Sequence, residues 1–212
     1  FSQLFKQLTL VLHSQEIPAL AGAAQSLGYM ITLVQERYLV VHDITPQRGW
    51  GFFVVDLQAK GQLAVEVPRA LDEPQVAAVA DSVFTALGAR YLAYAGSRSS
   101  RADDGSDDVL LNSQTLLQLF HRATGANNTL QLRGYTRLSA RQLLGVRRDQ
   151  QKLDLTVQQT SMWVKRSLPA DLVLQQLKLL LGDFTLNWHA PAAQNRQRDT
   201  SISGFAEVYI ND

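Results

Sequence analysis

The sequence contains no cysteine, which excludes disulfides, thiolate catalysis and cysteine-based zinc or iron–sulfur sites. It also lacks any run of 18 apolar residues, so we expect no transmembrane span. The phosphate-binding patterns GxGxxG and GxxxxGK[ST] are both absent, and Gly96-Ser97 is the nearest approach to the serine-hydrolase pattern GxSxG. The net charge of +1 creates no global field, so we expect no nucleic-acid partner. We also expect no cofactor, since the phosphate-binding patterns are absent.

The composition that remains is that of a globular protein, with 46% hydrophobic and 18% charged residues among 212. Arginine supplies most of the basic residues, which favours bidentate contacts with anions where such side chains converge. The chain begins at Phe1 rather than at methionine, which is typical of a removed signal, anchor or tag. Together with the absence of cysteine, this start predicts a periplasmic or cell-envelope protein, with the cytoplasm as the alternative.

The first third of the chain predicts two helices followed by antiparallel strands. The helices are Phe1–Leu12 and Ile17–Leu27, and the strands are Met30–Val34, Tyr38–His42, Gly49–Leu57 and Gln62–Val67. A turn at Gln35–Arg37 predicts a hairpin between the first two strands. A second turn, at Lys60-Gly61, predicts a hairpin between the last two.

From Glu73 onward, helices and strands alternate, which predicts parallel strands joined by crossover connections. The predicted helices are Glu73–Leu87, Ser113–Thr124 and Pro169–Leu181, with Asn112 or Ser113 capping the second. The predicted strands are Tyr91–Ala95, Thr129–Leu132, Leu153–Val157, Ser161–Val164, Phe184–Trp188 and Phe205–Ile210, the last at an edge of the sheet. The polar segment Ala190–Ser201 predicts a loop or a mobile segment.

These elements predict one α/β domain in which a mixed central sheet has helices on both faces. No internal repeat or linker interrupts it. Within that single domain, residues 1–48 hold the first helices and a hairpin, 49–135 a central core, and 136–212 the last strands and helix.

The loop that follows Tyr91–Ala95 is the main candidate for chemistry, because a charged loop at the end of a buried strand is where α/β proteins place functional groups. It contains Arg98, Arg101 and the sequence DDGSDD at Asp103–Asp108. The arginines can clamp a carboxylate or phosphate, or pair with the aspartates beside them. The aspartates can bind a hard cation, although their spacing does not match an EF-hand, or can cap the next helix.

The four histidines form no HxH or HxxxH pair, so the sequence predicts no local metal site from them. They are His13, His42, His121 and His189, and each is expected to be a surface or core side chain. Arg133, Arg137 and Arg141 recur every four residues, but the strand before Tyr135 argues against one basic helix face.

Five short segments occur in an order that resembles a known family. They are Arg48–Gly51; Val67-Pro68-Arg69 with Asp72 and Glu73 behind it; Gly96-Ser97-Arg98; Asp108–Asn112; and Gln131–Tyr135. This order is similar to that of bacterial zinc-dependent hydrolases related to poly-γ-glutamate hydrolases and, more distantly, to zinc carboxypeptidases. The resemblance covers about residues 49–135 and implies a zinc carboxypeptidase-like fold.

The chain departs from this family at the metal site, because Arg69, Ser97, Leu111 and Arg133 stand where the resemblance implies histidines. A guanidinium has no lone pair to give to zinc and repels the cation. The resemblance therefore implies a pseudoenzyme that binds a protein partner or an anionic glycan or peptide in the former active-site cleft. The predicted binding residues are Arg69, Arg98, Arg101 and Arg133.

Two other functions compete with this interpretation. One is a hydrolase of the amidase or peptidase type with a relocated metal or a different acidic site. Its candidate ligands are His42, Asp72, Glu73, Asp104 and Asp108, the last two from the loop cluster. The other is a structural module of a cell-envelope assembly, for which the start at Phe1 is the only support.

Overall fold

A computed structural model of the chain describes residues 1–11, 16–45, 49–98, 108–124, 128–134, 161–166, 171–183, 185–187 and 194–210. The described helices are α1 (Ser2–Leu10), α2 (Ile17–Ser26), α3 (Pro74–Ala86), α4 (Leu116–Ala123), α7 (Asp171–Leu181) and α8 (Arg196–Thr200). The described strands are β1 (Tyr29–Val34), β2 (Tyr38–Asp43), β3 (Phe52–Asp56), β4 (Ala64–Val67), β5 (Tyr91–Tyr94), β6 (Thr129–Gly134), β7 (Ser161–Arg166), β8 (Thr185–Asn187) and β9 (Phe205–Ile210).

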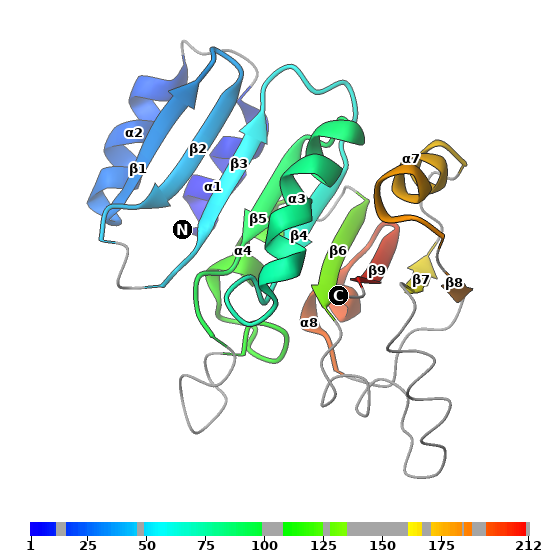
Figure 1. Cartoon of the computed structure of the whole chain (residues 1–212). Helices are drawn as coiled ribbons and strands as arrows, with labels where there is room; N and C mark the ends of the chain where they lie inside the picture. Colours follow the sequence, from blue (N-terminus) through cyan, green and yellow to red (C-terminus); the bar gives the residue numbers. More distant parts are fainter. Residues whose placement is uncertain are drawn as a thin grey trace.

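The strands form one mixed sheet in the order β1-β2-β3-β5-β4-β6-β9-β7-β8 (Figure 1). Strands β5, β4, β6 and β9 run parallel at its centre. On either side, β3 pairs antiparallel with β5, and β7 pairs antiparallel with β9. Because the four central strands share one direction, their carboxyl ends lie along one edge of the sheet.

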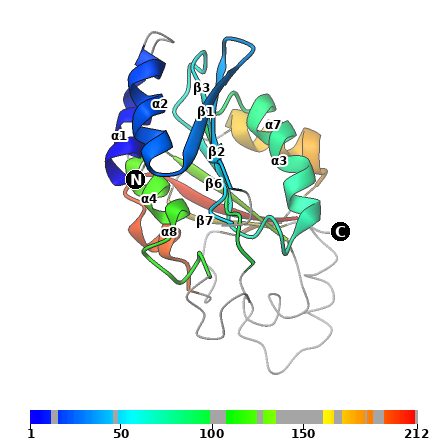
Figure 2. The same cartoon turned by 90° about the vertical axis from the view of Figure 1, so that its left-hand side faces the viewer.

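Helices cover both faces of this sheet (Figure 2). Helices α1, α2 and α4 pack on one face over Phe5, Phe53 and Phe120, and α8 lies on the same side. Helices α3 and α7 cover the other face, where Val83 and Leu177 are buried. The predicted α/β class, with a mixed sheet and helices on both faces in one domain, is therefore confirmed.

Helix α3 shows how local sequence sets an element next to the candidate site. Pro74 occupies its first turn, where the missing N–H would have no partner in the helix. Its buried side chains Val76, Ala80, Val83 and Phe84 lie three or four positions apart and form one apolar stripe. The helix ends at Ala86, and Gly88 follows with a φ of 55°, as predicted for a glycine stop.

Two predictions of strand placement are wrong. The strand at Gln62–Val67 does not form a hairpin with the strand before it, because β5 lies between β3 and β4. The last strand is not at an edge, since β9 lies between β6 and β7 and all six of its residues are buried. The sequence of β9 alternates because one face of the strand is polar, and that face is buried under α8. The alternation alone does not show whether a polar face is buried or exposed to solvent.

Two further corrections concern helix ends and loops. The segment Ala190–Ser201 is not a loop throughout, because it contains α8, whose Asn195 caps Arg198 N–H. Helix α4 is capped by Thr115, which accepts from Gln118 N–H, while Asn112 forms a turn with Gln114 N–H instead. The predicted strand Leu153–Val157 lies outside the described residues.

Asp56, at the end of β3, gives this sheet a predicted sensitivity to acid. Arg37 donates to it through Nε at 2.9 Å and Nη2 at 2.6 Å. Burial raises the pKa of Asp56, but the hydrogen bonds from Arg37 and Gln58 N–H outweigh this and leave the pKa below its usual value. The ion pair therefore stabilises the fold above the unfolded-state pKa of about 4 and is lost as pH falls further.

We expect Asp56→Asn to unfold at lower urea concentration than the wild type at neutral pH, with the difference shrinking as the solution is acidified below about pH 4. The measurement is urea unfolding followed by circular dichroism across this pH range. Glu36→Gln, an exposed neighbour in the hairpin turn, is the control. A stability difference that does not change with pH would contradict the assignment.

Candidate functional site

A cluster of charged side chains lies at the carboxyl ends of β4, β5 and β6. We call it the strand-end site, and it consists of Arg69, Asp72, Glu73, Arg98, Asp108 and Arg133. Its centre is the turn from β4 into α3, where the carbonyl of Arg69 accepts from Asp72 N–H at 3.0 Å and Glu73 N–H at 2.8 Å. This turn brings both carboxylates back over the end of β4.

Arg69 makes the shortest ion pair of the strand-end site. Its Nη2 donates to Asp108 Oδ2 at 2.8 Å, and the two side chains are 19% and 11% exposed. The other oxygen of Asp108 accepts from Leu110 N–H at 3.0 Å, so this aspartate also holds the turn that leads toward α4. Arg69 thereby ties the end of β4 to the segment before α4.

Arg98 follows β5 and is the most accessible member of the strand-end site. Its Nη1 lies 3.6 Å from Asp72 Oδ1, and its side chain is 64% exposed. An exposed pair at this distance contributes little to stability. The guanidinium of Arg98 can therefore exchange Asp72 for another anion at low cost.

Glycines fix the start of the loop that carries Arg98. A Cβ on Gly51 would lie 2.0 Å from the carbonyl oxygen of Tyr94, and a Cβ on Gly96 would lie 2.4 Å from Gly51 N. Gly51 also has a φ of 82°, which L side chains rarely adopt. This close approach of the backbone at Gly51 and Gly96 sets where the chain leaves β5.

Arg133 is the buried arginine of the strand-end site. It is 5% exposed, its Nε lies 3.5 Å from Glu73 Oε2, and its guanidinium lies over the ring of Tyr209 at 5.5 Å. The same Glu73 oxygen accepts from Gly134 N–H at 2.7 Å. A Cβ on Gly134 would lie 3.2 Å from the Cβ and Cγ of Glu73, so a glycine here admits the glutamate. Glu73 thus joins the turn after β4 to the end of β6.

Electrostatics keep Arg133 charged despite its burial. Burial lowers the pKa of this guanidinium, but the nearby carboxylates Glu73 and Glu207 raise the pKa above its usual value. The pKa of Tyr209 is also raised, first by burial and then by Glu207, against the opposing effect of Arg133. Tyr209 therefore keeps its proton and donates it to Glu207 Oε2 at 2.8 Å.

Three buried atoms of the strand-end site have no hydrogen-bond partner within the described segments. They are the donors Arg69 Nε and Arg133 Nε and the acceptor Glu73 Oε1. A buried polar atom without a partner costs about 1–3 kcal/mol, so such atoms need a compensating role. Here both kinds of atom, donor and acceptor, occur within one cluster.

The structure thus brings together three of the predicted binding residues, since Arg69, Arg98 and Arg133 each contact a carboxylate of the strand-end site. Arg101 and Asp104 lie outside the described residues. His42 lies on β2, separated from β4 by β3 and β5, with its Nδ1 3.2 Å from the carbonyl of Asp43. The sequence alone does not pair Asp72 with Arg98 or Glu73 with Arg133.

The strand-end site does not fit a catalytic zinc ion of the family's kind. Its three carboxylates each face an arginine, whose guanidinium supplies no lone pair and repels a cation. In the described ranges, no group of three or more histidine, cysteine, aspartate or glutamate side chains is arranged to hold a metal. The acidic residues of the loop 103–107 are outside those ranges.

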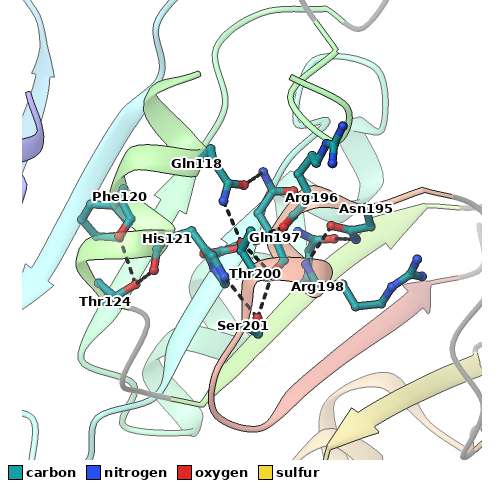
Figure 3. Close-up of polar contacts among 12 residues, drawn as sticks. Gln118, Phe120, His121, Thr124, Asn195, Arg196, Gln197, Arg198, Thr200 and Ser201 are labelled. Atoms are coloured by element: carbon teal, nitrogen blue, oxygen red, sulfur yellow. Dashed lines mark hydrogen bonds and ion pairs between the residues drawn. The ribbon is translucent and has the colours of Figure 1, made fainter. Parts of the chain in front are cut away.

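A buried network of polar side chains adjoins the strand-end site between the sheet and helices α4 and α8 (Figure 3). Its members are Glu66, Gln118, His121, Gln131, Asn195, Gln197, Arg198, Ser201, Glu207 and Tyr209. Asn195 Nδ2 lies 2.7 Å from both Gln131 Oε1 and Glu207 Oε1, which joins β6 to β9. Tyr209 links the network to Arg133.

Within this buried network, Glu66, His121 and Ser201 have the spacing of a Ser-His-acid triad. His121 Nδ1 lies 2.8 Å from Glu66 Oε1, and His121 Nε2 lies 3.1 Å from Ser201 Oγ. The residues are 0%, 1% and 5% exposed, respectively. Such distances are within the reach that nucleophilic catalysis requires, so the direction of each hydrogen bond decides the interpretation.

Hydrogen-bond accounting assigns a structural role to this triad. Ser201 Oγ lies 2.8 Å from the carbonyl of Gln197, which only accepts, so the single hydroxyl proton goes there. His121 Nε2 then donates to Ser201, and His121 Nδ1 donates to Glu66. An imidazole that donates at both nitrogens is a cation, and it balances the Glu66 carboxylate. A nucleophilic serine needs the opposite direction, in which it donates to the histidine.

None of the helices in the described part of the chain combines the length and the apolar character of a membrane span. No protein-family model, curated protein or solved structure matches the chain.

Proposed function

We propose that this chain is a non-catalytic domain, derived from a zinc hydrolase, whose strand-end site binds an anionic group of a peptide, a glycan or a protein partner. The observation that carries the proposal is that Arg69, Arg98 and Arg133 all meet the short turn between β4 and α3. In open α/β sheets, ligands bind beyond the carboxyl ends of the strands. The three arginines lie at the carboxyl ends of β4, β5 and β6.

The proposed origin of the site explains why arginines gather there. The resemblance implies metal ligands at positions 69 and 133, which follow β4 and lie in β6, two neighbouring parallel strands. A zinc carboxypeptidase-like arrangement of the fold is part of the proposal, and the common edge of β4, β5 and β6 supports it. Replacing an imidazole with a guanidinium removes a group that binds a metal cation and adds one that binds an anion.

The three arginines have different parts in the proposed binding. Arg98 is exposed and only loosely paired, and Arg69 is partly exposed, so these two contact the ligand. Arg133 is buried and positions Glu73 and the end of β6. The guanidinium groups of Arg69 and Arg98 can each bind a carboxylate through two parallel hydrogen bonds.

The proposal predicts metal-independent binding that depends on Arg69 and Arg98. The probes are N-acetyl-alanylalanine and digalacturonate, titrated calorimetrically into the wild-type protein in the presence of EDTA. We expect at least one probe to bind, and Arg69→Gln with Arg98→Ala to weaken it by about 10-fold to 100-fold, because a hydrogen bond to a charged group contributes about 1.5–3 kcal/mol.

Arg122→Ala, which removes an exposed arginine on α4, is the matched control and should leave the affinity unchanged. Circular dichroism of each variant verifies that it is folded. Binding that survives the double variant, or that requires added zinc, would contradict the proposal. So would stoichiometric zinc or manganese in the purified protein.

A further inference from the structure

The strand-end site has a balance of charge that constrains its ligand further. Its described members are three arginines and three carboxylates, each arginine being next to one carboxylate, so their charges sum to zero. A ligand that carries only negative charge must take an arginine away from its carboxylate. That carboxylate is then left without a partner.

Arg98 exchanges Asp72 at low cost, but the cost is high at Arg69 and Arg133, because their carboxylate partners are buried. Glu73 is 1% exposed and Asp108 is 8% exposed. A buried charge that loses its partner is strongly unfavourable, whereas exchange of one ion pair for two others is not. A ligand that brings an ammonium together with its carboxylate keeps the charges of the strand-end site in balance.

The three atoms of the strand-end site that lack a partner among the described residues match the same kind of ligand. Arg69 Nε and Arg133 Nε need an acceptor oxygen, and Glu73 Oε1 needs a donor. Glu73 and Arg133 are both more than nine-tenths buried. A carboxylate supplies acceptors only, and an ammonium supplies donors only, so neither group alone satisfies all three atoms.

We infer that the ligand of the strand-end site is a zwitterion, an amino acid or a short peptide with a free amino group and a free carboxylate. The inference rests on the proposed function. The carboxylate is held by Arg69 and Arg98, and the ammonium is held by Glu73. Glu73 N–H donates to the carbonyl of Arg69 at 2.8 Å, so the groups that hold the two ends start from one turn.

The test compares ligands that differ only in which end is blocked. Alanine and alanylalanine carry both charges, their N-acetyl forms carry only the negative charge, and alaninamide and alanylalaninamide carry only the positive charge. Each is titrated calorimetrically into the wild-type protein at pH 7. We expect one of the two doubly charged compounds to bind about tenfold or more tightly than both of its blocked forms.

Glu73→Gln provides the second arm, because it keeps the size of the side chain and removes its charge. It should abolish the preference for a free amino group while the N-acetyl form still binds. Glu36→Gln, on the exposed hairpin turn, should keep the preference. If the N-acetyl forms bind wild type as tightly as the doubly charged ones, the zwitterion inference fails and the proposed function stands. If neither these compounds nor digalacturonate binds, both fail.

Discussion

Replacing His121 with alanine is expected to destabilise the fold by about 3–5 kcal/mol, among the largest effects of any single substitution in this chain. His121 is buried between α4 and the sheet, and it pairs with the equally buried carboxylate of Glu66 at 2.8 Å. Without the imidazolium, the hydrogen bond that Glu66 keeps among the described side chains is the 3.4 Å contact with Gln131 Nε2. Urea unfolding followed by circular dichroism measures the loss.

Two comparisons separate the loss of charge pairing from a general loss of packing. The double variant Glu66→Met with His121→Leu removes both charges and should be more stable than His121→Ala, since no carboxylate is left unpaired. His42→Ala, at a half-buried position on β2, should cost much less. If His121→Ala lowers the unfolding free energy by less than about 1 kcal/mol, the cationic assignment of His121 is wrong.

Replacing Gly51 with alanine should cost about 3 kcal/mol or more, because the new Cβ meets backbone rather than a flexible side chain. The Cβ would lie 2.0 Å from the carbonyl oxygen of Tyr94, and the φ of 82° disfavours any L side chain. The backbone must shift, and the shift moves the segment that carries Arg98. We therefore expect weaker binding of the probes together with the loss of stability.

Gly22→Ala is the matched control, because this glycine lies inside α2 and a Cβ added to it would have nothing within 4 Å. Alanine there should stabilise the protein by about 0.5–1 kcal/mol, the usual gain inside a helix. Thermal unfolding of both variants gives the comparison. A Gly51→Ala protein as stable as the wild type would show that the strands do not approach each other as described.

Much of the fold follows from local patterns in the sequence. Two flanking strand patterns predict the hairpin at Gln35–Arg37, and residues Gln35 and Glu36 have the positive φ angles of a tight hairpin turn. The alternation after Glu73 predicts parallel pairing, which β4 makes with β5 and β6. These features depend on residues that are near each other in the chain.

The predictions that are wrong concern places where polar residues are buried or where segments distant in the sequence meet. The polar segment that forms helix α8 predicts a loop, yet Gln197 and Arg198 are buried in the network. The insertion of β5 between β3 and β4 leaves no mark on either strand's pattern. A sequence pattern records hydrophobicity and not partners.

In the candidate site, too, some features are predictable from the sequence and others are not. The positions of the arginines in the sequence predict that they lie at strand ends, and the parallel strands bring them to one edge. Their carboxylate partners are predictable only as neighbours in sequence, and the pairing of Glu73 with Arg133 spans two elements. The sequence predicts an ordinary histidine at His121, because Glu66 and Ser201 lie 55 and 80 residues away.

The most direct test of the central claim is NMR of the arginine side-chain Nε–H groups during titration of alanylalanine and alanine into EDTA-treated protein. Variants Arg69→Lys, Arg98→Lys and Arg133→Lys assign the signals. The account predicts that the signals of Arg69 and Arg98 shift on binding without any metal, because their guanidiniums receive the carboxylate. Unchanged signals at both arginines, or shifts that appear only after zinc is added, would contradict it.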